Sequence, residues 1–206
     1  MKKGYFITFE GAEGSGKSTQ IRRLAAYLRR KGRKVLLLRE PGGTRVSEAI
    51  REIILNKFFK EMKPETELLL YLAARAQIVR QKILPALQKG QVVICDRFED
   101  STAAYQGYGR KISLEAIEKV SKLLVRGNLV PSLTFILDID PRKGMARGGR
   151  HDRIERESFQ FHERVRHGFL QIARKNPKRC IVLNGLESRQ AVSQKIRKKI
   201  DRVFGL

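Results

Sequence analysis

A single motif near the beginning of the chain restricts the possible folds more than any other feature. Residues 11–18 read GAEGSGKS, which fits the pattern GxxxxGK(S/T). The motif lies between a strand-like run, Tyr5 to Glu10, and a helical pattern that begins at Lys17, which is the context that this pattern requires. Its glycines let backbone N–H groups turn inward, and the helix start adds positive potential, so we expect the loop to enclose phosphates. The residues expected to bind nucleotide phosphates are Gly11, Ala12, Glu13, Gly14, Ser15, Gly16, Lys17, Ser18 and Thr19.

Apolar, β-rich runs alternate with helical patterns along the chain, which is typical of a parallel sheet covered by helices. We therefore expect an α/β fold of the P-loop NTPase type, with three layers and a five-stranded parallel sheet flanked by helices. No repeat, low-complexity tract or linker interrupts the pattern, so residues 1–206 are expected to form one domain. The expected strands are Tyr5 to Glu10, Lys34 to Leu38, Gln91 to Cys95, Leu133 to Asp138 and Cys180 to Leu183, and the expected helices are Lys17 to Lys31, Glu65 to Lys89, Ile112 to Val125, Glu155 to Arg174 and Arg189 to Phe204.

The composition is strongly basic, because 44 Lys and Arg face 21 Asp and Glu and leave a formal net charge of +23. Dense runs such as Arg29 to Lys34 fit solvated helix faces, although nucleic-acid binding or thermostability would also accompany such a charge. No apolar stretch is long enough to cross a membrane and no signal-peptide core is present, so a cytoplasmic protein is expected. Cys95 and Cys180 lack metal or redox spacing and are expected to be buried thiols.

The apolar run VVICD ends in a carboxylate, Asp96. The tip of such a buried strand faces the nucleotide's metal in this fold class. Asp96 is therefore expected to hold Mg²⁺ together with the hydroxyl of Ser18, while Lys17 neutralises the β- and γ-phosphates of the nucleotide. Arg97 follows on the same rim, where its guanidinium can meet a phosphate through two hydrogen bonds.

Residues 142–156 read RKGMARGGRHDRIER, and they combine two adjacent glycines with five arginines between a predicted strand and a predicted helix. Such a density of charge excludes a core segment. We interpret this stretch as a mobile lid whose arginines cover an anionic substrate. A solvated, frayed loop is the alternative interpretation.

Five further motifs of the sequence indicate a known protein family. They are FEG at 9–11, REPGGT at 39–44, LYLAAR at 70–75, DRFEDSTAAYQG at 96–107 and DRIE at 152–155. Together they resemble bacterial thymidylate kinases, in the right order and over essentially the whole chain. The combination of REPGGT with DR…S…AYQ is specific to this family among small nucleotide kinases. The resemblance implies a homodimer that transfers the γ-phosphoryl group of Mg-ATP to dTMP, giving dTDP and ADP for dTTP synthesis.

The resemblance also implies a site for the acceptor nucleotide. Tyr71, where the family usually has Phe, would stack on the thymine, and Arg75, one helical turn later, would hydrogen-bond the base. Tyr105 would crowd the 2′ position of the sugar and so favour deoxyribose. Whether the peptide bond before Pro41 is cis stays open. The residues expected to bind dTMP are Glu13, Pro41, Arg51, Tyr71, Arg75, Arg97, Ser101, Thr102, Tyr105 and Gln106.

Members of this family place a transition-state arginine either in the P-loop or in the lid. The interior of the P-loop, residues 12–15, holds no basic residue here, so the resemblance implies the lid type. Arg150 and Arg153 are expected to be catalytic, together with Lys17 and Arg97. Which of Arg147 and Arg150 reaches the γ-phosphate is left open.

Two other functions compete with this interpretation. One is a kinase for another nucleoside monophosphate or for a deoxynucleoside, against which Arg75 and Gln106 argue. The other is a basic nucleic-acid-binding ATPase, which only the net charge supports; nucleic acid is not expected to be required. A GTPase is disfavoured because no NKxD motif is present: Asn56-Lys57 continues as Phe58-Phe59.

Overall fold

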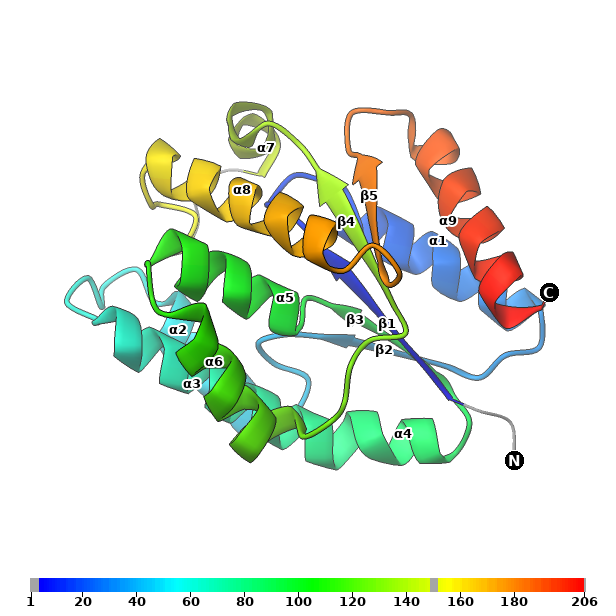
Figure 1. Ribbon diagram of the computed structural model, residues 1–206, viewed down its shortest axis with the longest axis horizontal. Coiled ribbons are helices and arrows are strands. Elements are labelled where there is room, and N and C mark those ends of the chain that lie inside the picture. The colour runs from blue at the N-terminus through cyan, green and yellow to red at the C-terminus, as the bar shows by residue number, and fades with distance from the viewer. Residues whose placement is uncertain (1–3, 149–151, 206) are drawn as a thin grey trace.

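The computed structural model describes residues 4–148 and 152–205. Within these ranges the chain forms a five-stranded parallel sheet in the order β2-β3-β1-β4-β5, with helices on both faces (Figure 1). The predicted α/β fold is therefore confirmed, and each strand lies within one residue of its predicted bounds. The strands are β1 (Tyr5–Glu10), β2 (Val35–Arg39), β3 (Val92–Asp96), β4 (Leu133–Asp138) and β5 (Cys180–Asn184).

A helix forms in each segment that the periodicity predicts, but the helix predicted to begin at Glu155 begins at Phe159. The predicted long helix from 65 to 89 is one continuous rod made of α3, the π-helical turn η1 and α4. The structure adds helices where no helix was predicted, namely α2, the α5–η2 segment and α7. The bounds are α1 (Lys17–Arg30), α2 (Arg45–Leu55), α3 (Pro64–Ile78), η1 (Val79–Ile83), α4 (Leu84–Gln88), α5 (Glu99–Thr102), η2 (Ala103–Gly109), α6 (Leu114–Val120), η3 (Ser121–Arg126), α7 (Pro141–Gly148), α8 (Phe159–Lys175) and α9 (Arg189–Phe204).

Successive side chains of a strand point to opposite faces of the sheet. The strands therefore contribute apolar side chains to hydrophobic clusters on both faces, and helices cover both. Phe9 of β1 packs with Leu28 of α1 and Ile196 of α9 on one face. Phe6 of the same strand packs against Phe98 on the opposite face, with the η1 region. Since these side chains are almost fully buried, the layers hold the carboxyl ends of the strands in place.

The carboxyl ends of the first three strands meet at one edge of the sheet. The register aligns Phe9 of β1 with Asp96 of β3, and Asp96 with Arg39 of β2. This edge is where ligands bind in open parallel sheets. The P-loop begins there at Gly11, whose φ is 127°. A Cβ atom added at Gly11 would lie only 2.4 Å from the carbonyl oxygen of Leu137, so the position admits only glycine.

Most of the first half of the predicted lid is helical, although no helix was predicted there. Pro141–Gly148 form helix α7, with proline at the favourable first position, and the role of this stretch as a lid stays a prediction. α7 lies directly against the P-loop, because a Cβ atom added at Gly144 would approach the carbonyl oxygen of Glu13 to 2.6 Å. The sequence did not predict this short helix because residues 142–148 are mostly charged or glycine and show no apolar periodicity. Residues 152–158 form turns, whereas Arg150 lies outside the described residues.

Two smaller expectations also have an outcome. Cys95 and Cys180 are free, buried cysteines, as predicted. In the described part of the chain, no helix is both long and apolar enough to cross a membrane.

Candidate active site

The P-loop forms one wall of a cleft of about 850 Å³. Lys17 is buried there, and its ammonium donates hydrogen bonds to the carbonyl oxygens of Gly11 (3.0 Å) and Ala12 (2.9 Å). Burial, aided by the nearby charge of Arg97, lowers the pKa of Lys17 to about 8. The other wall comes from residues 185–189 after β5 and from Arg147 of α7, whose guanidinium lies 3.5 Å from the carbonyl oxygen of Gly14. The cleft therefore extends from the phosphate loop to the segment that follows β5.

Ser18 and Asp96 lie together at the base of this cleft, with 3.4 Å between the Ser18 hydroxyl and one carboxylate oxygen of Asp96. The other carboxylate oxygen, Oδ1, is buried and has no hydrogen-bond partner among the described residues. A hydroxyl and a carboxylate oxygen are hard ligands of the kind that Mg²⁺ prefers. Within residues 4–148 and 152–205, no cluster of three or more His, Cys, Asp or Glu could hold a metal by itself. The pair thus fits a Mg²⁺ ion that completes its coordination with nucleotide oxygens and water.

Arg97 connects the phosphate loop to the rest of the site. Its guanidinium donates to the carbonyl oxygen of Gly11 (3.0 Å), to the hydroxyl of Ser101 (3.3 Å) and to the carboxylate of Glu13 (3.2 Å). It also lies 5.1 Å from the centre of the Tyr105 ring. The charges of Arg97 and then Lys17 lower the pKa of Glu13 to about 2, so this carboxylate is ionised beside the phosphate loop.

Glu10 is a further site residue, whose role no sequence motif indicated. Its fully buried carboxylate accepts hydrogen bonds from the amide of Phe98 (2.8 Å) and the hydroxyl of Ser101 (2.5 Å). Arg97, between Asp96 and Phe98, has the left-handed φ of 73°, which is unfavourable for a non-glycine residue. Glu10 thus stabilises the turn that aims Arg97 at the P-loop. Burial, followed by repulsion from Asp100, raises the pKa of Glu10 to about 8.

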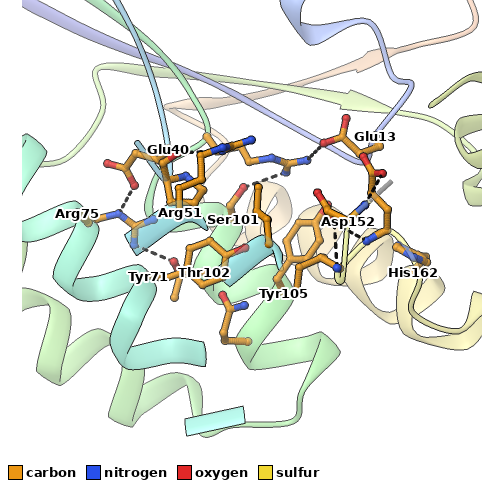
Figure 2. A pocket seen from close by; sticks show the side chains of 16 residues that line it. Glu13, Glu40, Arg51, Tyr71, Arg75, Ser101, Thr102, Tyr105, Asp152 and His162 are labelled. Atoms are coloured by element: carbon orange, nitrogen blue, oxygen red, sulfur yellow. Dashed lines mark hydrogen bonds and ion pairs between the residues drawn. The ribbon is translucent and has the colours of Figure 1, made fainter. Parts of the chain in front are cut away.

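A second pocket adjoins the phosphate cleft and is formed by α2, α3, α5–η2 and the loop after β2 (Figure 2). Figure 2 shows Arg75 and Thr102 on one side of this pocket and Glu13 with His162 on the opposite side. All ten residues that we expected to bind dTMP line it. The structure therefore brings together side chains that are up to 93 positions apart in the sequence, from Glu13 to Gln106.

We call this second pocket the acceptor pocket, after the dTMP that we expect it to bind. Arg75 is held at its inner wall. It is 1% exposed and donates to Glu40 (2.6 Å), Glu99 (3.1 Å) and Thr102 (2.8 Å) through Nε and Nη1. Its remaining nitrogen, Nη2, makes no hydrogen bond to a described residue, so it can donate to a ligand. Although burial alone would lower it, the two carboxylates keep the pKa of Arg75 above its usual range.

Two aromatic residues line the same pocket. Tyr71 lies one helical turn before Arg75, and burial raises the pKa of its phenol, which therefore stays neutral. Tyr105 is 8% exposed and packs near Phe161 and Phe169 of α8. Two flat side chains thus face the pocket from different helices.

The loop after β2 supplies the remaining wall. The Glu40–Pro41 peptide bond is cis, which answers the question that the sequence left open. The carbonyl oxygen of Pro41 accepts a hydrogen bond from Arg51 at 2.8 Å. Arg51 itself lines both the phosphate cleft and the acceptor pocket.

The structure places Arg153 differently from our expectation. Its guanidinium pairs with Glu67 (2.7 Å) and donates to the carbonyl oxygen of Ile54 (3.0 Å), and it lines neither the phosphate cleft nor the acceptor pocket. Glu67 also accepts hydrogen bonds from Gln106 and Arg110. These contacts anchor the segment after α7 to α2 and α3. Among the lid arginines that the structure describes, only Arg147 lines the phosphate cleft.

Comparison with known proteins identifies the family. Residues 9–196 match the family model described as thymidylate kinase. A thymidylate kinase of Pelotomaculum thermopropionicum is 50% identical over 98% of this chain and 95% of its own, and one of Geobacter sulfurreducens is 48% identical over 92% and 93%. The crystal structure of thymidylate kinase from Ehrlichia chaffeensis matches with a TM-score of 0.78 at 37% identity, over 96% of this chain and 99% of that one. The chain, whose phosphate loop and acceptor pocket meet at Arg97, therefore belongs to the thymidylate kinase family.

Proposed function

We propose that this protein transfers the γ-phosphoryl group of ATP to dTMP, giving ADP and dTDP for dTTP synthesis. One observation carries the proposal: Glu13, Arg51 and Arg97 line both the phosphate cleft and the acceptor pocket, so the two sites share a boundary of charged side chains. A donor phosphate in one and an acceptor phosphate in the other would meet there. Holding both phosphates in line supplies most of the catalysis in phosphoryl transfer.

On the donor side, the backbone amides of residues 11–19 and the ammonium of Lys17 bind the phosphates of ATP. Lys17 now bonds to the carbonyl oxygens of Gly11 and Ala12, and it would exchange them for phosphate oxygens. Arg147 is the lid arginine that approaches the γ-phosphate, because its guanidinium lies 3.5 Å from the carbonyl oxygen of Gly14 in the P-loop and 3.4 Å from that of Gly185 after β5. We assign Arg153 an anchoring role instead, and Arg150 stays a prediction.

Ser18 and Asp96 are the residues that would hold Mg²⁺ beside the phosphates of ATP. The ion, when bound, neutralises charge that develops on the β- and γ-phosphate oxygens during transfer. The orphaned, buried oxygen of Asp96 supports this assignment.

On the acceptor side, Arg97 and Arg51 bind the phosphate of dTMP. Tyr71 stacks on the thymine. Arg75 donates a hydrogen bond to the base from Nη2, the nitrogen that makes no hydrogen bond to a described residue. Pro41, Ser101, Thr102 and Gln106 complete the polar and apolar walls of the pocket. Tyr105, which lines the same pocket, would crowd a 2′-hydroxyl of the sugar. The ionised carboxylate of Glu13 accepts a hydrogen bond from the 3′-hydroxyl of the sugar and contributes to the metal shell.

The chemistry requires no general base in the protein. The attacking oxygen of dTMP belongs to a phosphate that is already a dianion near neutral pH, so no proton has to be removed from it. The cationic side chains of Lys17, Arg97 and Arg147 reduce the repulsion between the two phosphates and stabilise the charge of the transferring group.

We also propose that the active form is a homodimer. Helix α3 packs against helix α2 and against the turn η3, and the three elements together expose large apolar side chains. Burying such a surface against a second copy removes it from water. The exposed residues are Val46, Ile53, Leu69, Leu123 and Leu124. Sedimentation equilibrium of the wild-type protein beside a Leu123→Asp variant tests this part of the proposal.

An acceptor profile tests the proposed reaction. Steady-state rates with Mg-ATP should be highest for dTMP, lower for dUMP, and at background for UMP, CMP and thymidine. ADP and dTDP should form in equal amounts. A higher kcat/KM for another nucleoside monophosphate would show that the acceptor site has been assigned to the wrong base.

A further inference from the structure

The phosphate cleft does not account for the net charge of the chain, and much of that charge gathers on one face. Residues 18–34, which include all of α1 after Lys17, hold seven Lys and Arg and no Asp or Glu. Residues 189–204, which form α9, hold six Lys and Arg and one Asp. These two short segments therefore contribute about half of the +23 charge. We call their outer surface the α1–α9 face.

The two helices lie side by side, as Figure 1 shows at the right of the view. Gln20 near the start of α1 donates to the carbonyl oxygen of Arg189 at the start of α9 (3.0 Å). Further along, the hydroxyl of Tyr27 donates to Asp201 (2.6 Å), and Arg197 lies 5.1 Å from the Tyr27 ring. Since the starts meet each other and the later turns meet each other, the helices run in the same direction. These contacts hold α1 and α9 beside each other, so the Lys and Arg side chains on their outer sides belong to one continuous face.

Most of the cations of this face are exposed, although Arg33, Arg197 and Lys199 are half-buried, and most lack acidic partners. The single carboxylate, Asp201, already bonds to Tyr27. Lys195 pairs with Glu187, but Arg23, Arg30 and Lys198 form no ion pair with any residue of the described ranges, and the same holds for the exposed Arg202. Crowding like charges without partners is unfavourable in a free protein and becomes favourable when a polyanion covers them.

The apolar content of the face discriminates between two kinds of anionic partner. A protein that docks on a membrane surface combines basic residues with apolar side chains that enter the bilayer. Of the large hydrophobic residues exposed in the described ranges, only Val203 lies on α1 or α9, and it is 36% exposed. A partner that offers only a row of phosphates suits this composition better than a lipid bilayer does.

We propose that the α1–α9 face binds the phosphate backbone of nucleic acid without reading its bases. α1 has 14 residues and is therefore about 21 Å long, which matches roughly six base pairs of duplex. Its exposed cations recur at a spacing of seven residues, at Arg22 and Arg29 and again at Arg23 and Arg30. Contacts of this kind depend on counterion release, so affinity falls steeply with salt.

Fluorescence anisotropy with a labelled DNA duplex of mixed sequence, about 24 base pairs long, tests the proposal. The full chain is used with saturating ADP and dTMP, so that the phosphate cleft is filled. For about four to five phosphate contacts, log Kd should change with log salt concentration with a slope of magnitude about 4, and a second unrelated DNA sequence should bind equally well.

A pair of matched variants locates the binding. The test variant replaces Arg23, Arg30, Lys198 and Arg202 by Gln, and the control variant makes the same four-charge change away from this face. The control positions are Arg80, Lys82, Lys89 and Lys178, all exposed. The test variant should raise Kd by about 30-fold or more and lower the salt slope by about 3, whereas the control should stay within about threefold of wild type. Both variants should keep wild-type dTMP kinase rates.

Three outcomes would overturn the proposal. Equal weakening by both variants would mean that net charge alone attracts DNA, with no particular face. If the wild-type protein shows no salt-sensitive binding to DNA, nucleic acid is not the partner of this face. Binding to vesicles of phosphatidylserine and phosphatidylcholine that is tighter than binding to DNA, and is lost only in the test variant, would assign the face to membranes instead.

Discussion

The carboxylate of Glu10 accepts a hydrogen bond from the backbone amide of Phe98 across 2.8 Å, directly beyond the left-handed residue Arg97. This contact links the end of β1 to the turn after β3. The P-loop begins one residue after Glu10, so the same carboxylate lies between the loop that holds the donor and the arginine that we assign to the acceptor phosphate. Two variants of Glu10 separate its positioning role from simple packing.

Glu10→Ala should lower kcat for dTMP by about 10-fold or more, because no other residue of the described ranges accepts a hydrogen bond from the Phe98 amide. Glu10→Gln keeps an acceptor oxygen and should restore most of the rate. The readout is kcat and KM at a single, mildly alkaline pH for both variants. Equal rates in the two variants would contradict the positioning role.

Glu10 also makes a prediction about pH. Its pKa is raised from an ordinary 4.5 to about 8, mainly by burial, so between these values the folded protein binds more protons than the unfolded chain. The stability contributed by protonated Glu10 is present below pH 4.5 and is lost as pH rises through 8. The Tm of the wild type should therefore fall relative to that of Glu10→Gln between about pH 5 and about pH 8, as measured by calorimetry. A constant difference across this range would contradict the assigned shift.

Lys17→Ala should reduce kcat by at least about 10²–10³-fold, because it removes the charge that faces the β- and γ-phosphates. The fold should persist, since the buried ammonium serves polar carbonyl groups and not apolar packing. Rapid-quench assays and circular dichroism measure the two effects. Lys31→Ala, on the exposed end of the same helix segment, is the matched control and should leave both unchanged.

Two of the described lid arginines, Arg147 and Arg153, should respond differently to truncation. Arg147→Ala should lower kcat with little change in the KM for dTMP, because we place Arg147 at the transferring phosphate. Arg153→Ala should instead lower stability by about 2 kcal/mol, less than for an isolated buried pair, since Glu67 keeps Arg110 and Gln106. For a chain of this size that corresponds to a Tm decrease of about 4–8 °C. A wild-type Tm with a large loss of kcat in Arg153→Ala would restore Arg153 as the catalytic lid residue.

Tyr71→Ala should weaken dTMP binding by about 5- to 150-fold, which corresponds to the roughly 1–3 kcal/mol that a stacked base contributes. Tyr71→Phe should retain most of the affinity, because the stacking ring stays. Isothermal titration with dTMP measures both. Unchanged affinity in Tyr71→Ala would move the thymine away from α3.

Tyr105→Ala should relax the preference for deoxyribose. The expected effect is a rise in kcat/KM for the ribose analogue of dTMP that exceeds any loss for dTMP itself, because the side chain acts by steric exclusion. Competition between the two acceptors in one reaction gives this ratio directly. An unchanged ratio would show that another residue meets the 2′ position.

The sequence by itself determined the sheet and the phosphate loop. The bounds of the strands and the position of the P-loop depend on local patterns, such as the apolar run before Gly11 and the helical spacing of Leu24 and Leu28. These patterns can be identified without knowing which distant segments the fold brings together. The motifs also selected ten residues that line one pocket, and their role in binding dTMP stays a prediction.

Only the tertiary structure decided how individual charged side chains are used. Arg153 and Arg147 lie six residues apart in the same arginine-rich stretch, yet one meets the buried carboxylate of Glu67 and the other lies over the P-loop at Gly14. Glu10 looked like the last residue of a strand, and its partners lie 88 and 91 positions away. The partner of a long, flexible ionic side chain depends on which distant groups the fold brings within a few ångströms, and no local pattern carries that information.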